Sequence, residues 1–97
     1  MPRAFCIAEV EITDPETFKS YGSRVLDTLT RYGGRYIARG GNTVSLEGEP
    51  PKRVVISEWK SIEDAKRWYE SPEYAEIIGI RHKACKSRLF LVEGLAT

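Results

Sequence analysis

Alternating apolar and polar residues at the start of the chain predict a strand over residues 4–12. Successive side chains of a strand point to opposite faces of a sheet, so a period of two divides this segment into two sets. Phe5 and Ile7 share one face with Glu9 and Glu11. The other face holds small and aliphatic residues, namely Ala4, Cys6, Ala8, Val10 and Ile12. We therefore expect a first strand with apolar residues on both faces.

A single long helix is expected between Asp14 and the glycine pair that begins at Gly33. Asp14 is a favoured N-cap residue, and Pro15 fits the first position of a helix. Glycine can adopt the left-handed conformation that ends a helix. Between these signals, apolar residues recur at spacings of three and four: Phe18, Tyr21, Val25, Leu26, Leu29 and Tyr32. Such a stripe predicts one continuous helix that packs on one side.

Residues 35–46 and 53–59 predict the second and third strands. Gly40-Gly41 interrupts the first of them, and a glycine pair inside a strand is typical of a bulge or bend. A proline pair follows at positions 50 and 51. Because proline has no N–H to donate to a strand ladder, that pair belongs to the connection between the two strands.

A second helical region is expected over residues 62–84, with a break at the Ser-Pro step that begins at Ser71. Ser61 and Ser71 are N-cap candidates. The last strand is expected over residues 88–94. The element order is therefore β-α-β-β-α-β, the order of an α+β ferredoxin-like fold with a four-stranded antiparallel sheet, and we expect residues 1–97 to form one domain.

The predicted strands carry apolar residues on both faces of the sheet. In the third strand Val54 and Ile56 alternate with Val55 and Trp59, and the last strand reads Leu89, Phe90, Leu91, Val92. Helices cover only one face of such a sheet, and a solvated face is expected to be polar. An apolar bare face usually has a partner, and two-fold dimers are the commonest assemblies. We expect a homodimer joined sheet to sheet, and the pattern leaves open which set of residues meets the partner.

Composition and charge exclude several classes of function. The 97 residues carry 15 Lys and Arg against 14 Asp and Glu, a formal net charge of +1. That balance lacks the basic excess on which nucleic-acid and anionic-membrane binders rely. The RNA recognition motif shares this element order, but it needs exposed aromatic residues where the third strand is mostly aliphatic. We expect no nucleic-acid partner and, because no apolar run approaches roughly 20 residues, no membrane helix.

The cysteines and the N-terminus favour the cytoplasm. Cys6 and Cys85 are too few for a disulfide framework, and we expect both thiols to stay reduced. The first residues hold no signal-peptide core. A zinc site built from His82, Cys85 and Cys6 is disfavoured, since zinc ligands are normally more closely spaced. We expect neither a metal nor a cofactor.

Arg39, Arg81 and His82 are the polar residues that suggest a ligand contact. Arg39 precedes the glycine pair and could clamp a carboxylate through two hydrogen bonds, or else pair with Glu47 or Glu58. His82 is the only histidine, and an imidazole side chain suits a general base. The alternative is that the basic run around it stabilises a helix C-terminus.

Aromatic residues at helical and strand spacings are typical of a core, but they would also line a pocket for a flat ligand: Tyr21, Tyr36, Trp59, Trp68, Tyr69 and Tyr74.

Several of these motifs occur together in a known family. The run comprises Gly33-Gly34-Arg35-Tyr36, Arg39-Gly40-Gly41, Leu46-Glu47-Gly48, Arg53-Val54-Val55-Ile56 with Trp59, Trp68-Tyr69-Glu70-Ser71-Pro72-Glu73-Tyr74, and Arg81. It resembles the bacterial domain-of-unknown-function family 1330, which is similar in fold to the dimeric α/β-barrel superfamily. The resemblance implies a homodimer whose sheets face each other, with a pocket in each subunit between sheet and helices. Relatives in that superfamily include cofactor-independent monooxygenases, lactone isomerases and stress-related proteins.

Two hypotheses follow. In the first, the protein is a small homodimer that binds an organic carboxylate or aromatic ligand between sheet and helices. In the second, it is a cofactor-independent enzyme of the superfamily type, a monooxygenase or isomerase acting on a small aromatic or lactone. The candidate ligand-binding residues are Tyr21, Arg39, Trp59, Arg81 and His82.

Overall fold

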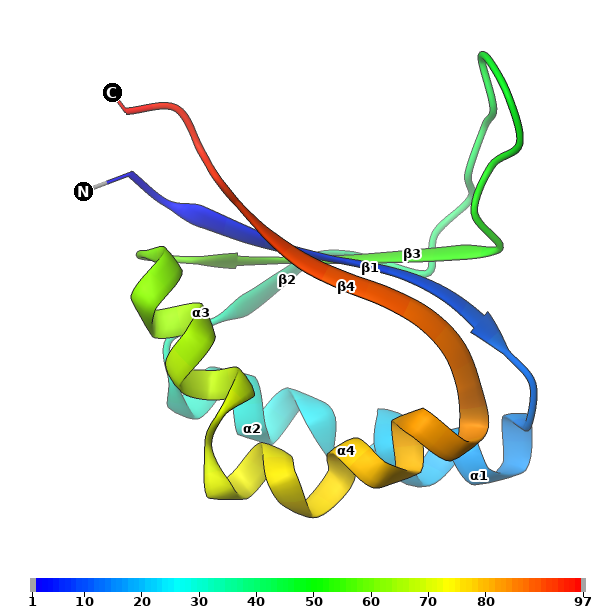
Figure 1. Cartoon of the computed structure of the whole chain (residues 1–97), viewed down its shortest axis with the longest axis horizontal. Helices are drawn as coiled ribbons and strands as arrows, with labels where there is room; N and C mark the ends of the chain where they lie inside the picture. The colour runs from blue at the N-terminus through cyan, green and yellow to red at the C-terminus, as the bar shows by residue number, and fades with distance from the viewer. Residues whose placement is uncertain (1, 97) are drawn as a thin grey trace.

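A computed structural model of the chain describes residues 2–96 and follows the predicted element order. The elements are β1 (Ala4–Ile12), α1 (Pro15–Gly22), α2 (Val25–Arg31), β2 (Arg35–Arg39), β3 (Arg53–Trp59), α3 (Ile62–Tyr69), α4 (Pro72–Ala84) and β4 (Cys85–Glu93). The strands form one antiparallel sheet in the order β2-β3-β1-β4. All four helices lie on one side of it (Figure 1). The α+β ferredoxin-like fold is thereby confirmed.

The helices begin where the capping residues predicted. The side chain of Asp14 accepts a hydrogen bond from the Thr17 amide at 3.2 Å, and Pro15 opens α1. Ser61 caps α3 in the same way. Ser71 accepts from the backbone N–H of the third residue of α4 at 3.1 Å and separates α3 from α4. Each of these side chains satisfies an amide that the first helical turn leaves without a backbone partner.

The first helical region is two helices, so the prediction of one continuous helix was wrong. The break lies at Ser23, whose amide donates to the Lys19 carbonyl and whose hydroxyl bonds the Ser20 carbonyl. Serine competes for backbone hydrogen bonds in this way, and the preceding Gly22 is a weak helix former. The apolar stripe continues across the break to the buried Val25, so its period gave no sign of it.

The second strand is also shorter than expected, because it ends at Arg39. Gly40 has a φ of 71°, and residues 40–52 form a long connection with no strand. The irregularity predicted at Gly40-Gly41 lies earlier, between Tyr36 and Ala38. The connection rises on the side of the sheet away from the helices (Figure 1), and its Leu46 is 92% exposed. The last strand differs too, since β4 follows α4 without a loop and ends at Glu93.

The core lies between the sheet and the helices. The largest fully buried side chains are Trp59, Tyr74, Leu29 and Ile77. Trp59 packs against Trp68 with ring centroids 5.2 Å apart. The close approach of Trp59 also explains Gly34, where a Cβ would lie 2.5 Å from the indole ring. Glycine is therefore required at that position for steric reasons.

The opposite face of the sheet also carries apolar side chains, and no helix within residues 2–96 covers it. We call it the bare face and define it by Phe5, Ile7, Val54, Ile56, Phe90 and Val92, which alternate with the core-facing residues of the same strands. Phe90 is 40% and Val92 45% exposed. Ion pairs flank this apolar centre, Arg35 with Glu58 at 2.6 Å and Arg88 with Glu9 at 3.1 Å.

Candidate functional site

A small cavity of about 50 Å³ lies on the helix-covered side of the sheet, and we call it the arginine cavity. Strands β1, β2, β3 and β4 supply one wall, and helices α1, α2 and α4 supply the other. The cavity is lined by Ala8, Val10, Phe18, Tyr21, Gly22, Val25, Tyr36, Arg39, Arg53, Val55, Arg81 and Leu89. Its lining is therefore apolar except for three arginines and two tyrosines.

Arg39 reaches the cavity from the end of β2. Its Nη2 donates to the carbonyl of Gly22 at 2.8 Å, where α1 ends. Its guanidinium also lies 4.5 Å from the centroid of the Tyr36 ring, a cation–π arrangement. Arg39 does not pair with Glu47 or Glu58; the partners of Glu58 are Arg35 and Arg3. The side chain is thus held in place by a carbonyl and a ring, neither of which neutralises its charge.

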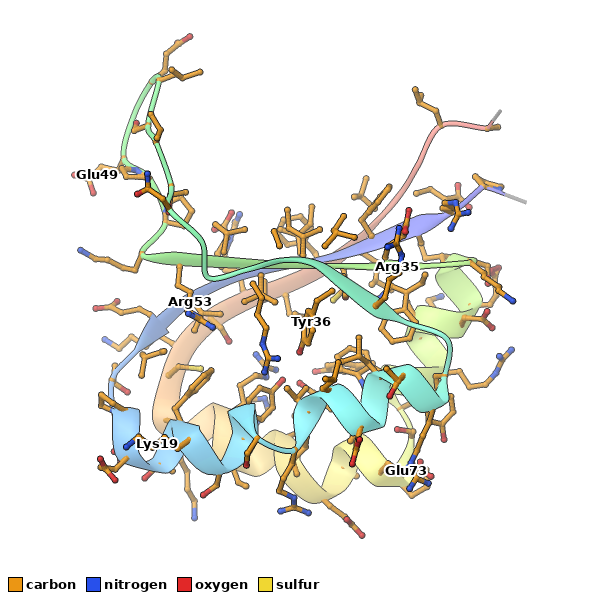
Figure 2. All side chains as sticks on the ribbon, turned by 180° about the vertical axis from the view of Figure 1, so that it is seen from behind. Lys19, Arg35, Tyr36, Glu49, Arg53 and Glu73 are labelled. Carbon is orange, nitrogen blue, oxygen red and sulfur yellow. The ribbon has the colours of Figure 1, made fainter. Side chains whose placement is uncertain are left out.

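Arg53 enters the cavity from the first residue of β3. Figure 2 shows Arg53 and Tyr36 pointing from the sheet toward the helices. A Cβ on Gly40 would collide with the guanidinium of Arg53. Glycine at position 40 therefore has two roles: it adopts a positive φ, and it leaves room for Arg53 to lie against the backbone. The Nε of Arg53 is buried and has no hydrogen-bond partner.

Arg81 is the most buried of the three arginines, with 6% of its surface exposed. Its Nη1 donates to the Ser87 hydroxyl at 2.5 Å, and its Nη2 lies 3.4 Å from the His82 ring. The Nε is buried without a partner. Burial lowers the pKa of Arg81, while the adjoining Tyr74 and Tyr21 raise it, and the net change is a rise. The guanidinium therefore stays charged.

The cavity carries positive charge without a compensating acid. Its lining contains no aspartate or glutamate. Over residues 2–96, none of these three arginines forms an ion pair, although seven other pairs are present. A buried charge without a partner costs several kcal/mol, and like charges add to that cost. An anion in the cavity would offset both penalties.

Two tyrosine hydroxyls lie beside Arg81. The hydroxyl of Tyr21 is 2.8 Å from that of Tyr74, and both side chains are buried. Burial raises the pKa of each phenol, and burial likewise raises the pKa of Tyr36 to about 12. These hydroxyls are therefore neutral near pH 7 and act as hydrogen-bond donors rather than as phenolate bases. In the Tyr21–Tyr74 pair, one hydroxyl donates to the other and the second hydrogen is free for a further acceptor.

The fold brings together only part of the predicted residue set. Tyr21, Arg39 and Arg81 line the arginine cavity. Trp59 lies in the core against Trp68, and His82 is exposed on α4, so neither lines it. Arg53 was missed, although a period of two along β3 already placed it on the face of Val55 and Trp59.

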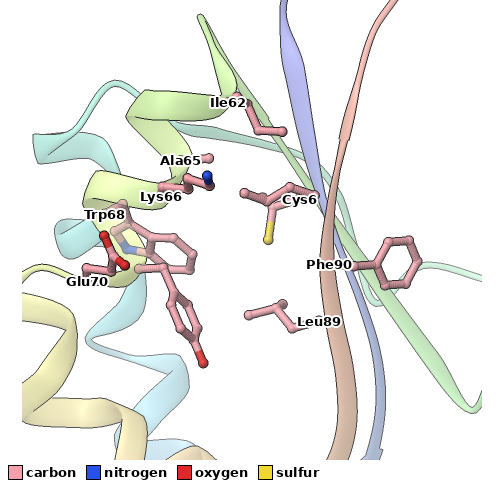
Figure 3. Close-up of a pocket in the computed structure, with 10 residues that line it drawn as sticks. Cys6, Ile62, Ala65, Lys66, Trp68, Glu70, Leu89 and Phe90 are labelled. Carbon is pink, nitrogen blue, oxygen red and sulfur yellow. The ribbon is translucent and has the colours of Figure 1, made fainter.

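A larger hollow of about 460 Å³ lies farther along the sheet, and we call it the apolar pocket. It is lined by Cys6, Ile62, Ala65, Lys66, Trp68, Tyr69, Glu70, Leu89, Phe90 and Leu91. Figure 3 shows Cys6 and Leu89 pointing toward α3, whereas the ring of Phe90 turns to the other side of the strands. Burial raises the pKa of the Cys6 thiol to about 11, so this thiol is protonated and unreactive near neutral pH.

The part of the chain that the structure describes contains neither a candidate metal site nor a candidate membrane-spanning helix. Residues 2–96 contain no cluster of three or more His, Cys, Asp or Glu side chains that could hold a metal ion. None of the helices is long and apolar enough to cross a membrane. Both cysteines are free and buried.

Comparison with known proteins identifies the family. Residues 3–95 match the family described as Domain of unknown function (DUF1330), and the chain belongs to it. No match is found among curated proteins. A protein of unknown function from Rhodopseudomonas palustris is similar in structure, with a TM-score of 0.78, 22% identity, and coverage of 99% of this chain and 85% of the other.

Two further solved structures share the fold. SnoaB, a cofactor-independent oxygenase from Streptomyces nogalater, has a TM-score of 0.71 at 14% identity, with 100% of this chain and 97% of the other covered. A dimeric protein of unknown function with a ferredoxin-like fold from Bacteroides fragilis has a TM-score of 0.65 at 14% identity, covering 95% and 96%. At these identities the likeness establishes the fold alone.

Proposed function

We propose that this member of the DUF1330 family is a cytoplasmic homodimer that binds a small organic carboxylate in the arginine cavity. The observation that carries the proposal is the charge of that cavity. Three arginines surround a space with no acidic lining residue, and Arg81 is buried with an unpartnered Nε. A carboxylate accepts paired hydrogen bonds from guanidinium groups and supplies the missing negative charge.

The dimer part of the proposal rests on the bare face. Its apolar centre and its flanking ion pairs have the layout of a protein interface, with an apolar middle and a polar rim. The Bacteroides fragilis protein of the same fold is dimeric. Light scattering after size exclusion should give twice the chain mass of 11.0 kDa, and a monomer at micromolar concentration would contradict this part.

Calorimetric titration tests the carboxylate site. Acetate and glycolate should bind, while the uncharged acetamide, similar in shape to acetate, should not. Arg39→Gln removes one cavity charge at an exposed position, so the variant should fold, and affinity should fall about tenfold to a hundredfold, the usual loss for a hydrogen bond to a charged group. Arg31→Gln makes the same charge change on the outer surface of α2 and serves as the control.

The outcomes of this titration are distinct. Equal loss in Arg39→Gln and Arg31→Gln would mean that only net charge matters, which would overturn the site. Absence of binding by every small carboxylate would overturn the proposed function as a whole. Arg81→Gln is the stronger test of the buried charge, and its circular dichroism spectrum shows whether the variant is folded before its affinity is compared.

A second candidate is a cofactor-independent enzyme, a monooxygenase or isomerase acting on a small aromatic or lactone. The hydrogen-bonded Tyr21–Tyr74 pair beside Arg81 favours it, because neutral phenols and a guanidinium can polarise a carbonyl oxygen. SnoaB, of the same fold, is a cofactor-independent oxygenase. Tyr21→Phe separates the two candidates: an enzyme would lose turnover at nearly unchanged ligand affinity, whereas a binding protein has no turnover to lose.

A further inference from the structure

The arginine cavity and the apolar pocket lie on the same side of the sheet and share one wall. Leu89, on the edge strand β4, lines both. Leu91, two residues on, lines the apolar pocket alone, and Ala8 lines the arginine cavity alone. The two hollows are therefore neighbours along the sheet, separated by the half-buried side chain of Leu89.

A row of three tyrosines also connects the two hollows. Tyr69 lines the apolar pocket, and its ring centroid lies 5.6 Å from that of Tyr74. The Tyr74 hydroxyl lies 2.8 Å from that of Tyr21, which lines the arginine cavity. Rings are in contact along the whole row, since the centroids of Tyr21 and Tyr74 are 6.2 Å apart, and a hydroxyl contact is added at its Tyr21–Tyr74 end.

The two volumes differ in what they can hold. A cavity needs about 10–15 Å³ of such space for one water molecule, so about 50 Å³ accepts a group of only a few atoms, such as a carboxylate. The apolar pocket, at about 460 Å³, is within the size range of sites for small organic molecules. Its charged lining side chains, Lys66 and Glu70, are both exposed. The interior beside Trp68 and Leu91 is apolar.

We infer that the two hollows form one site for an amphipathic carboxylic acid, with the carboxylate at Arg81 and an alkyl or aryl body extending past Leu89 into the apolar pocket. This inference rests on the proposed function, because it places the same carboxylate in the same arginine cavity. It adds the class of the body and its location. Leu89 is then a specificity-determining residue, since its side chain must move aside for the body to pass.

Titration with a chain-length series tests the inference. Acetate, butanoate, hexanoate and octanoate share one head group and differ only in methylene count. Each buried methylene should raise affinity about fourfold, the equivalent of about 0.8 kcal/mol. Octyl alcohol, which has the tail without the charge, should bind far more weakly than octanoate.

A pair of tryptophan variants locates the tail. Ile62→Trp adds bulk to the apolar pocket at a residue that does not line the arginine cavity, so it should abolish the gain with chain length and leave acetate affinity unchanged. Leu26→Trp makes a similar change at an exposed position on α2 that lines neither hollow, and it should change nothing. Thermal unfolding of each variant verifies that it is folded.

The failure of this inference differs from the failure of the proposed function. If acetate binds through Arg39 but affinity is flat from acetate to octanoate, the inference is overturned and the carboxylate site remains. If Ile62→Trp and Leu26→Trp reduce octanoate binding equally, the tail does not lie in the apolar pocket. If octanoate binds equally well to Arg39→Gln, to folded Arg81→Gln and to the unsubstituted chain, the head does not reach the arginine cavity. If no acid in the series binds, both are overturned.

Discussion

The two faces of the sheet are built from alternate residues of the same strands, and both are apolar. They differ in whether the charged side chains beside them have partners of opposite charge. On the bare face, two ion pairs lie beside the apolar centre, Arg35–Glu58 and Arg88–Glu9. On the helix-covered face, Arg53 and Arg81 point into the space between sheet and helices without an acidic partner.

The two faces therefore suit binding partners of different size. Paired charges around an apolar patch are suited to a large partner that brings its own apolar surface. Unpaired buried charges in a small cavity are suited to a small anion. The same four strands therefore support two proposals of different scale, a second chain on one face and a ligand behind the other.

The largest effect is expected on the covered face, from Trp59→Ala. Trp59 is 1% exposed and packs against Trp68, so its truncation should lower the free energy of unfolding by about 3–5 kcal/mol. Urea denaturation followed by circular dichroism measures the loss. Leu46→Ala, at a residue that is 92% exposed, should stay within about 0.5 kcal/mol. A similar loss in both variants would contradict this assignment of the core.

The next effect concerns the bare face and should appear in association rather than in folding. Phe90→Lys places a charge at the apolar centre, and an unpaired charge buried in an interface should weaken the dimer at least a hundredfold. Light scattering across a dilution series should show monomers at concentrations where the unsubstituted chain is dimeric. Lys86→Glu, farther along the same strand face, is the control. Unchanged mass for Phe90→Lys would move the interface elsewhere.

A smaller effect is expected from pH, again on the covered face. The pKa of Cys6 is about 11 in the folded chain against 9.0 ordinarily, so the folded state keeps its proton more tightly than the unfolded state does. The contribution of the Cys6 thiol to the free energy of unfolding is fully present below pH 9. It is lost as the pH rises toward 11, which lowers the free energy of unfolding by up to about 3 kcal/mol. Cys6→Ala should show a shallower decline in urea denaturation between these pH values. Identical slopes would contradict the assignment.

Much of the fold could be predicted because its signals are local. Asp14, Ser61 and Ser71 each cap a helix through an atom three residues away, so sequence spacing alone is enough to find them. The break at Ser23 could not be found in this way, since the stripe that defines a helix continues on both sides of it. The end of β2 was missed for a related reason: Val44 and Leu46 read as strand residues but have nothing to pack against.

The candidate site was less predictable, because it depends on which way a long side chain turns. Arg81, His82 and Lys83 look alike as a basic helix end, and only tertiary packing selects Arg81 for burial. Arg53 opens a strand and reads as a solvated end. Its role depends on the space above Gly40, which lies across the strand pair rather than nearby in sequence.

Residues near the two ends of the described chain, Arg3 and Gly94, lie side by side, which has a practical consequence. The amide of Gly94 donates to the carbonyl of Arg3 at 2.7 Å, and the chain leaves the sheet there on the side away from the helices (Figure 1). A purification tag or fluorescent fusion at either end therefore emerges next to the bare face. A bulky fusion partner can block self-association there, and a fusion partner that itself oligomerises can produce a false dimer. Mass measurements should therefore be made after the tag is cleaved.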